Sequence, residues 1–164
     1  MNASTIMDEF KRHNELSRAS VQTILENNPL KLELLSVARE QTTRVFALSL
    51  LQWFIRLRKE EQGVGSDDLV FAAVLIGQHG HVEDCLRIWE AKQCDFDTYC
   101  GLDIQAMMFA GVERTIAFLK DQKDEQGKRA MRYVIECREA GDFDHLDTYL
   151  QEHKRYWMPL SPEA

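Results

Sequence analysis

The stretch VFALSLLQWFIRL, residues 45–57, decides the fold class of this chain. Its polar residues Ser49, Gln52 and Arg56 recur at intervals of three and four, so they form one narrow stripe on an α-helix. Apolar side chains surround the rest of that helix, which must therefore be covered on nearly all sides. We expect a central core helix here.

An alternative is that another chain completes the cover of this helix. Large aromatic side chains are the usual anchors of protein interfaces. Trp53 and Phe54 are therefore candidate binding residues.

The same spacing of three and four continues through the whole chain, and no segment alternates apolar and polar residues as a strand does. We predict an all-α protein. Gly63-Val64-Gly65 is the clearest break, since Ser66 and the acids after it are typical of a helix start. The expected organisation is an N-terminal helical section (1–62), a repeat section (66–155) and a tail (156–164), together forming one compact unit.

The repeat section is marked by three glycines. Gly80, Gly111 and Gly141 lie 31 and 30 residues apart, and each is followed closely by an apolar residue. Glycine adopts the left-handed conformation that ends a helix, so each one predicts a turn between two paired helices. Units of this length stack because none buries its apolar face alone. We expect about three irregular stacked helical hairpins, an α-solenoid-like arrangement.

The residues of this section also invite a family comparison. GHVEDCLRIWEA from Gly80 and AGVERTIAFL from Ala110 are similar to the second helices of ankyrin repeats, which follow a Gly-containing turn. Residues 67–153 thus resemble a degenerate ankyrin-like array. The Thr-Pro-Leu-His opening of that family is absent, and residues 1–65 are not covered.

The turn DFDTYCGLD, which begins at Asp95, starts with carboxylates at alternate positions, as a calcium loop does. Cys100 stands where that loop needs glycine and Ala106 where it needs glutamate, so we expect Asp and Thr to cap a helix that starts near Leu102. The candidate binding residues of this turn are Asp95, Phe96, Asp97 and Tyr99.

Catalytic and metal-binding patterns are weak. His79, His81 and Cys85 are possible zinc ligands, but their spacing matches no usual zinc pattern, so we expect no metal. The sequence contains no GxSxG, GxxxxGK[ST] or HExxH motif. We expect a protein that is not an enzyme and needs no cofactor.

Charge and cysteine content narrow the partners and the compartment. The net charge of −7 disfavours nucleic acid and anionic membranes, because their binding needs surplus Lys and Arg. Four cysteines without a CxxC pair, together with charged residues at the N-terminus, favour a reducing cytoplasm. Residues 1–65 hold nine basic and eight acidic residues, whereas residues 66–164 hold eleven and nineteen.

These features predict a non-catalytic protein–protein interaction or scaffold module, because stacked hairpins present a groove and no other feature carries chemistry. Its partner is another protein or a second copy of the chain. One alternative is an acidic, immunity-like inhibitor that binds a basic partner. The other is a metal-dependent enzyme that uses His79, His81 and Cys85.

Overall fold

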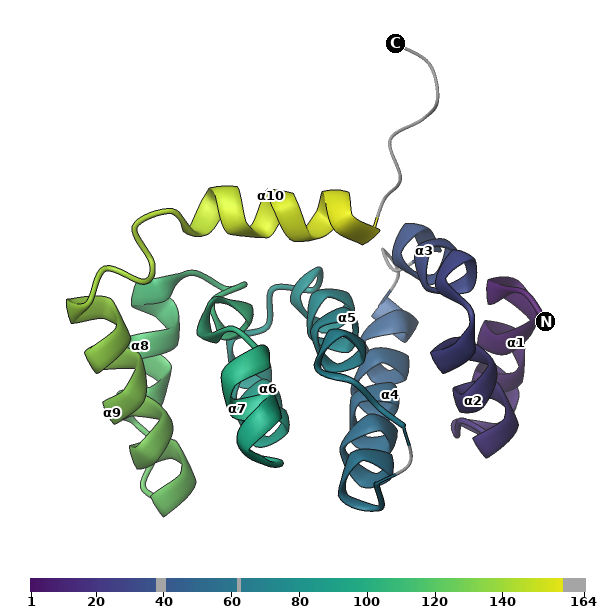
Figure 1. Cartoon of the computed structure of the whole chain (residues 1–164), viewed down its shortest axis with the longest axis horizontal. Helices are drawn as coiled ribbons and strands as arrows, with labels where there is room; N and C mark the ends of the chain where they lie inside the picture. Colours follow the sequence, from purple (N-terminus) through teal and green to yellow (C-terminus); the bar gives the residue numbers. More distant parts are fainter. Residues whose placement is uncertain (38–40, 62, 158–164) are drawn as a thin grey trace, which may run out of the picture.

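A computed structural model describes residues 1–37, 41–61 and 63–157, and within them the chain is all-α, as predicted. The described residues form ten α-helices and two short 3-10 helices, with no strand among them (Figure 1). The elements are α1 (Ala3–His13), α2 (Arg18–Glu26), α3 (Asn28–Val37), α4 (Gln41–Lys59), α5 (Ser66–Gly77), η1 (Val82–Asp84), α6 (Cys85–Lys92), α7 (Phe96–Gly101), η2 (Ile104–Met107), α8 (Val112–Lys120), α9 (Glu125–Glu139) and α10 (Leu146–Trp157). None of the described helices is both long and apolar enough to cross a bilayer.

The helices follow one another along the long axis of the molecule (Figure 1). α4 packs against α5 and α8 packs against α9, with α6 and α7 between these two pairs. Helix α10 runs across the ends of this row and contacts α3, α5 and η2. It continues through Trp157, so the helix includes the first two residues of the predicted tail.

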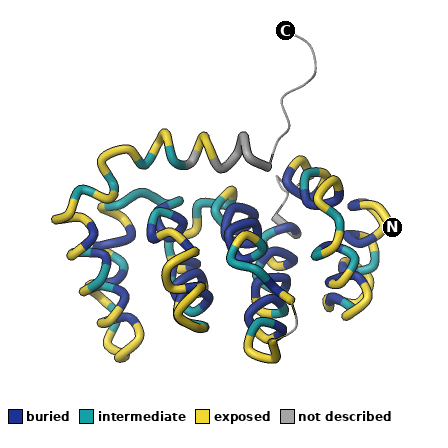
Figure 2. The backbone as a smooth tube through the Cα atoms, viewed as in Figure 1, coloured by how far each residue is buried: buried dark blue, intermediate teal, exposed yellow. Residues whose placement is uncertain are grey.

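The core is centred on α4 and α5 (Figure 2). Phe46, Leu50 and Phe54 of α4 are fully or almost fully buried, as their spacing of four predicts. Helix α5 is enclosed even more completely: residues 69–76 are all buried, because α4, α7, η2 and α10 surround the helix. α4 keeps an open side, where Val45 is exposed. The most enclosed helix is thus α5.

The repeat glycines have the predicted backbone conformation, but they do not join the helices that pack most closely. Gly80, Gly111 and Gly141 have φ of +64°, +98° and +86°. Gly141 leads into α10, which crosses the row and does not form a pair with α9 (Figure 1). The loop between the packed helices α8 and α9 contains no repeat glycine. A glycine with positive φ can end a helix, but its conformation does not determine which helices pack together.

Candidate functional site

The site begins with the short helix α7, which carries four of the candidate binding residues. Asp95 caps this helix: its Oδ1 accepts a hydrogen bond from the Thr98 amide at 2.8 Å, and Thr98 Oγ1 accepts one from the Asp95 amide at 3.0 Å. The capping role of Asp and Thr agrees with the sequence prediction. The predicted start of the helix is wrong: α7 begins at Phe96 and not near Leu102.

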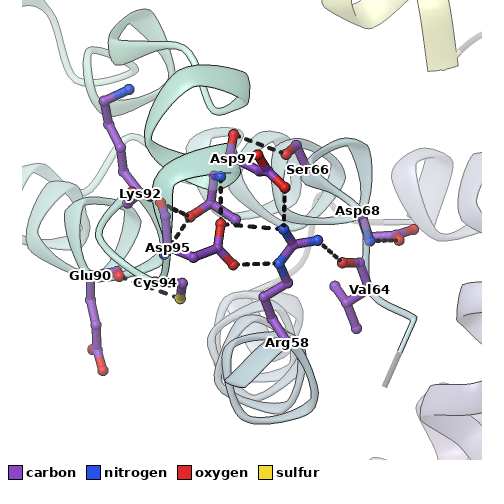
Figure 3. Close-up of polar contacts among 11 residues, drawn as sticks. Arg58, Val64, Ser66, Asp68, Glu90, Lys92, Cys94, Asp95 and Asp97 are labelled. Atoms are coloured by element: carbon purple, nitrogen blue, oxygen red, sulfur yellow. Dashed lines mark hydrogen bonds and ion pairs between the residues drawn. The ribbon is translucent and has the colours of Figure 1, made fainter. Parts of the chain in front are cut away.

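Arg58 ties α7 to the end of α4 (Figure 3). Its Nε and Nη2 donate to the two carboxylate oxygens of Asp95, at 2.6 and 3.2 Å. Its Nη1 donates to the carbonyl of Val64 at 2.7 Å, and Nη2 also reaches Asp97 Oδ2 at 3.5 Å. The hydrogen bonds from Arg58, and then that from the Thr98 amide, lower the pKa of Asp95 to about 2. Asp95 is therefore a fixed carboxylate.

Between α7 and the loop that follows α4 lies a groove of about 630 Å³, which we call the Phe96 groove. The aromatic ring of Phe96 borders it with 79% of the residue exposed, and the Asp97 side chain is 80% exposed. Tyr99 is 36% exposed on the same helix. The residues that line the groove are Arg58, Glu61, Gly63, Val64, Gly65, Asp95, Phe96 and Asp97.

A second hollow of about 450 Å³ adjoins the Phe96 groove at the start of α5, and Gly63 and Gly65 border both. Lys31 lies buried at this hollow, and its Nζ donates to Asp68 Oδ1 at 2.7 Å. Asp68 Oδ2 in turn accepts from the Gly65 amide at 2.9 Å. The cation here is therefore already paired with a carboxylate.

Lys92 holds the other end of α7 from inside the protein. The residue is 3% exposed, and its Nζ donates to the carbonyls of Tyr99 and Leu102. The same ammonium lies 4.8 Å from the ring centroid of Tyr99 and 5.6 Å from that of Tyr133. Burial lowers the pKa of Lys92. Lys92 thus fixes the helix that presents Phe96.

The two aromatic candidates on α4 have different environments. Phe54 is 0% exposed and belongs to the core, which corrects its assignment as a binding residue. Trp53 is half-buried, and the Arg56 guanidinium lies 4.9 Å from its ring centroid. Only Trp53 of this pair is accessible to a partner.

The possible zinc ligands have separate partners. His79 Nε2 lies 3.1 Å from Thr43 Oγ1, and His81 Nδ1 lies 3.2 Å from Glu83 Oε1. Cys85 is buried, and desolvation raises the pKa of its thiol to about 12. Across the described part of the chain, no three His, Cys, Asp or Glu side chains gather in a way that could hold a metal ion.

Arg58, Glu61 and Lys92 are charged site residues that the sequence analysis missed. Arg58 lies in the last turn of α4, where cations interact favourably with the helix dipole. A cation at this position therefore gives no sign of a further role. Its contact with Asp95 spans 37 residues, and no motif marks two positions so far apart as neighbours. Lys92 is the last residue of an amphipathic helix and gives no signal of burial in the sequence.

Comparison of the chain with protein-family models, with curated proteins and with solved structures finds no match. The similarity of residues 67–153 to ankyrin repeats therefore remains a resemblance carried by the quoted residues.

Proposed function

We propose that this protein is a non-catalytic binding module that docks another protein at the Phe96 groove. The observation that carries the proposal is the position of Phe96, a large aromatic residue that is 79% exposed beside a groove of about 630 Å³. Aromatic side chains that enter a partner's pocket supply much of the binding energy of protein interfaces. A groove next to such a side chain offers the partner a complementary surface.

The fixed carboxylate Asp95 of the groove and the buried thiols of the core support binding over catalysis. Asp95 is fixed as a carboxylate by Arg58, so it is a poor general acid at neutral pH. Desolvation raises the pKa of the Cys85 thiol to about 12 and that of Cys137 to about 11. Thiols in such surroundings are poor nucleophiles, because the thiolate is the reactive form.

The compartment that we propose is the cytoplasm. All four cysteines are free, and two of them are buried. Free thiols persist in a reducing environment.

The test is a comparison of Phe96→Ala with Val45→Ala, which removes an exposed apolar side chain from α4. Proteins retained from native lysate by the wild type are identified, purified and titrated calorimetrically with the wild type, Val45→Ala and Phe96→Ala. We expect Phe96→Ala to weaken binding by at least about 30-fold, the usual effect of removing an aromatic anchor. Equal affinity of all three proteins would reject the groove as the docking site.

A further inference from the structure

We propose that the Phe96 groove recognises a basic, partly apolar segment of the partner. A Lys or Arg side chain of that segment lies against Asp97 and Glu61, and an apolar neighbour lies on the ring of Phe96. This inference rests on the proposed function and adds to it the chemical class of the partner.

The charges that line the groove favour a cation. The lining contains one guanidinium and three carboxylates, those of Glu61, Asp95 and Asp97. The guanidinium of Arg58 already donates to Asp95, Asp97 and the Val64 carbonyl. Because Asp95 and Asp97 flank the guanidinium, an anionic ligand would meet like charge before it met Arg58. In the adjoining hollow the cation Lys31 is likewise already paired with a carboxylate, that of Asp68.

Two of the three carboxylates are accessible to a partner. The Asp97 side chain is 80% exposed, and its contact with Arg58 is long, at 3.5 Å. Glu61 is exposed in the turn that follows α4, and no described residue forms an ion pair with it. The two acids and Phe96 all border the groove, so an aliphatic stem with a cationic end contacts both kinds of surface.

The acidic charge of residues 66–164 also favours a basic partner. Residues 66–164 carry eleven basic and nineteen acidic residues, so a basic segment is attracted to this half before it makes contact. A second copy of the chain fits the groove poorly. A symmetric contact would place Asp97 and Glu61 of two copies against each other, and like charges across an interface repel.

The probe is a library of random peptides displayed on phage. Peptides are selected on the immobilised wild-type protein and screened again on Phe96→Ala. Each peptide that needs Phe96 for binding is synthesised in two versions. One has the selected sequence, and the other has Gln in place of every Lys and Arg. Their affinity is then measured for the wild type, for the double variant Asp97→Asn/Glu61→Gln, and for Asp121→Asn as a charge control on the exposed turn after α8. Thermal unfolding of each variant shows that it is folded.

We expect the selected peptides to be basic, with an apolar residue next to Lys or Arg. The double variant and the Gln-substituted peptides should each bind about fivefold more weakly or worse, since two exposed ion pairs are lost, while Asp121→Asn binds normally. Phe96-dependent peptides that are neutral or acidic would overturn the partner class and leave the proposed function intact. A selection that yields no Phe96-dependent peptide would overturn both proposals.

Discussion

At the scale of single residues, burial keeps the interior thiols protonated. Desolvation is the main cause for Cys85, whose thiol pKa rises to about 12, and for Cys137, whose thiol pKa rises to about 11. Both residues pack in the core, and both are free thiols. Because these thiol pKa values are higher in the folded state than in the unfolded state, the free energy of unfolding depends on pH in the alkaline range.

For Cys85 the sign of this linkage is fixed. An unfolded thiol ionises near its ordinary pKa of 9.0, while the folded protein keeps the proton up to about pH 12. The folded state thus binds more protons in this window, and the free energy of unfolding falls as the pH rises through it. Between about pH 8 and about pH 10.5 we expect Cys85 to account for a loss of about 2 kcal/mol.

Urea unfolding at both pH values measures this effect. Cys85→Ala should show a smaller alkaline loss than the wild type, because the titrating thiol is gone. Cys100→Ala, which removes an exposed thiol, is the control for a cysteine substitution outside the core. The same alkaline loss in Cys85→Ala and in the wild type would contradict the account.

Trp53 and Phe54 are neighbours on α4 with unequal burial, which gives a matched pair of substitutions. Phe54→Ala should cost about 3–5 kcal/mol, as for a fully buried aromatic residue. Trp53→Ala should cost about 1–3 kcal/mol, because only part of that side chain leaves water on folding. Urea unfolding of both variants tests this order, and a larger loss for Trp53→Ala would place the tryptophan in the core.

At the scale of elements, α7 is the feature on which the site depends. It has six residues, too few for a helix to be stable alone in water. Asp95 and Thr98 fix its start, and Lys92 holds the carbonyls near its end. The presentation of Phe96 is therefore a consequence of tertiary contacts.

The sequence predicted the elements better than the contacts between them. Periodicity was enough to predict an all-α chain, and the turn glycines have the expected positive φ. The prediction that Asp and Thr of this turn cap a helix agrees with the structure, but the predicted start near Leu102 is wrong, since the helix begins at Phe96. Arg58 and Lys92 could not be predicted as site residues, because their roles arise from segments that meet only in the folded chain.

Lys92→Met tests the support of α7. The substitution keeps an apolar stem and removes the ammonium that donates to Tyr99 and Leu102, so one buried and one partly buried carbonyl lose their partner. We expect the amides of α7 to exchange with deuterium about tenfold faster, which corresponds to about 1.4 kcal/mol of local stability. Amides in the middle of α9 serve as the internal control. If the exchange of α7 is unchanged in the folded variant, Lys92 does not support this helix.

At the scale of the whole molecule, the Phe96 groove combines two parts of the chain. Arg58 and Glu61 come from the N-terminal section, and Asp95 to Asp97 come from the predicted repeat section. The ion pair between Arg58 and Asp95 links the two. The groove therefore exists only when both sections are packed together, and it lies beside the strongly acidic part of the sequence.

The central claim is that a partner docks at this groove. Its most direct test is an amide proton–nitrogen correlation spectrum of the labelled wild-type protein, recorded during titration with a purified partner whose capture depends on Phe96. The account predicts that the largest shift changes fall on residues 61, 63–65 and 95–97, which border the groove. Shift changes centred on α8 and α9, with residues 95–97 unaffected, would contradict it.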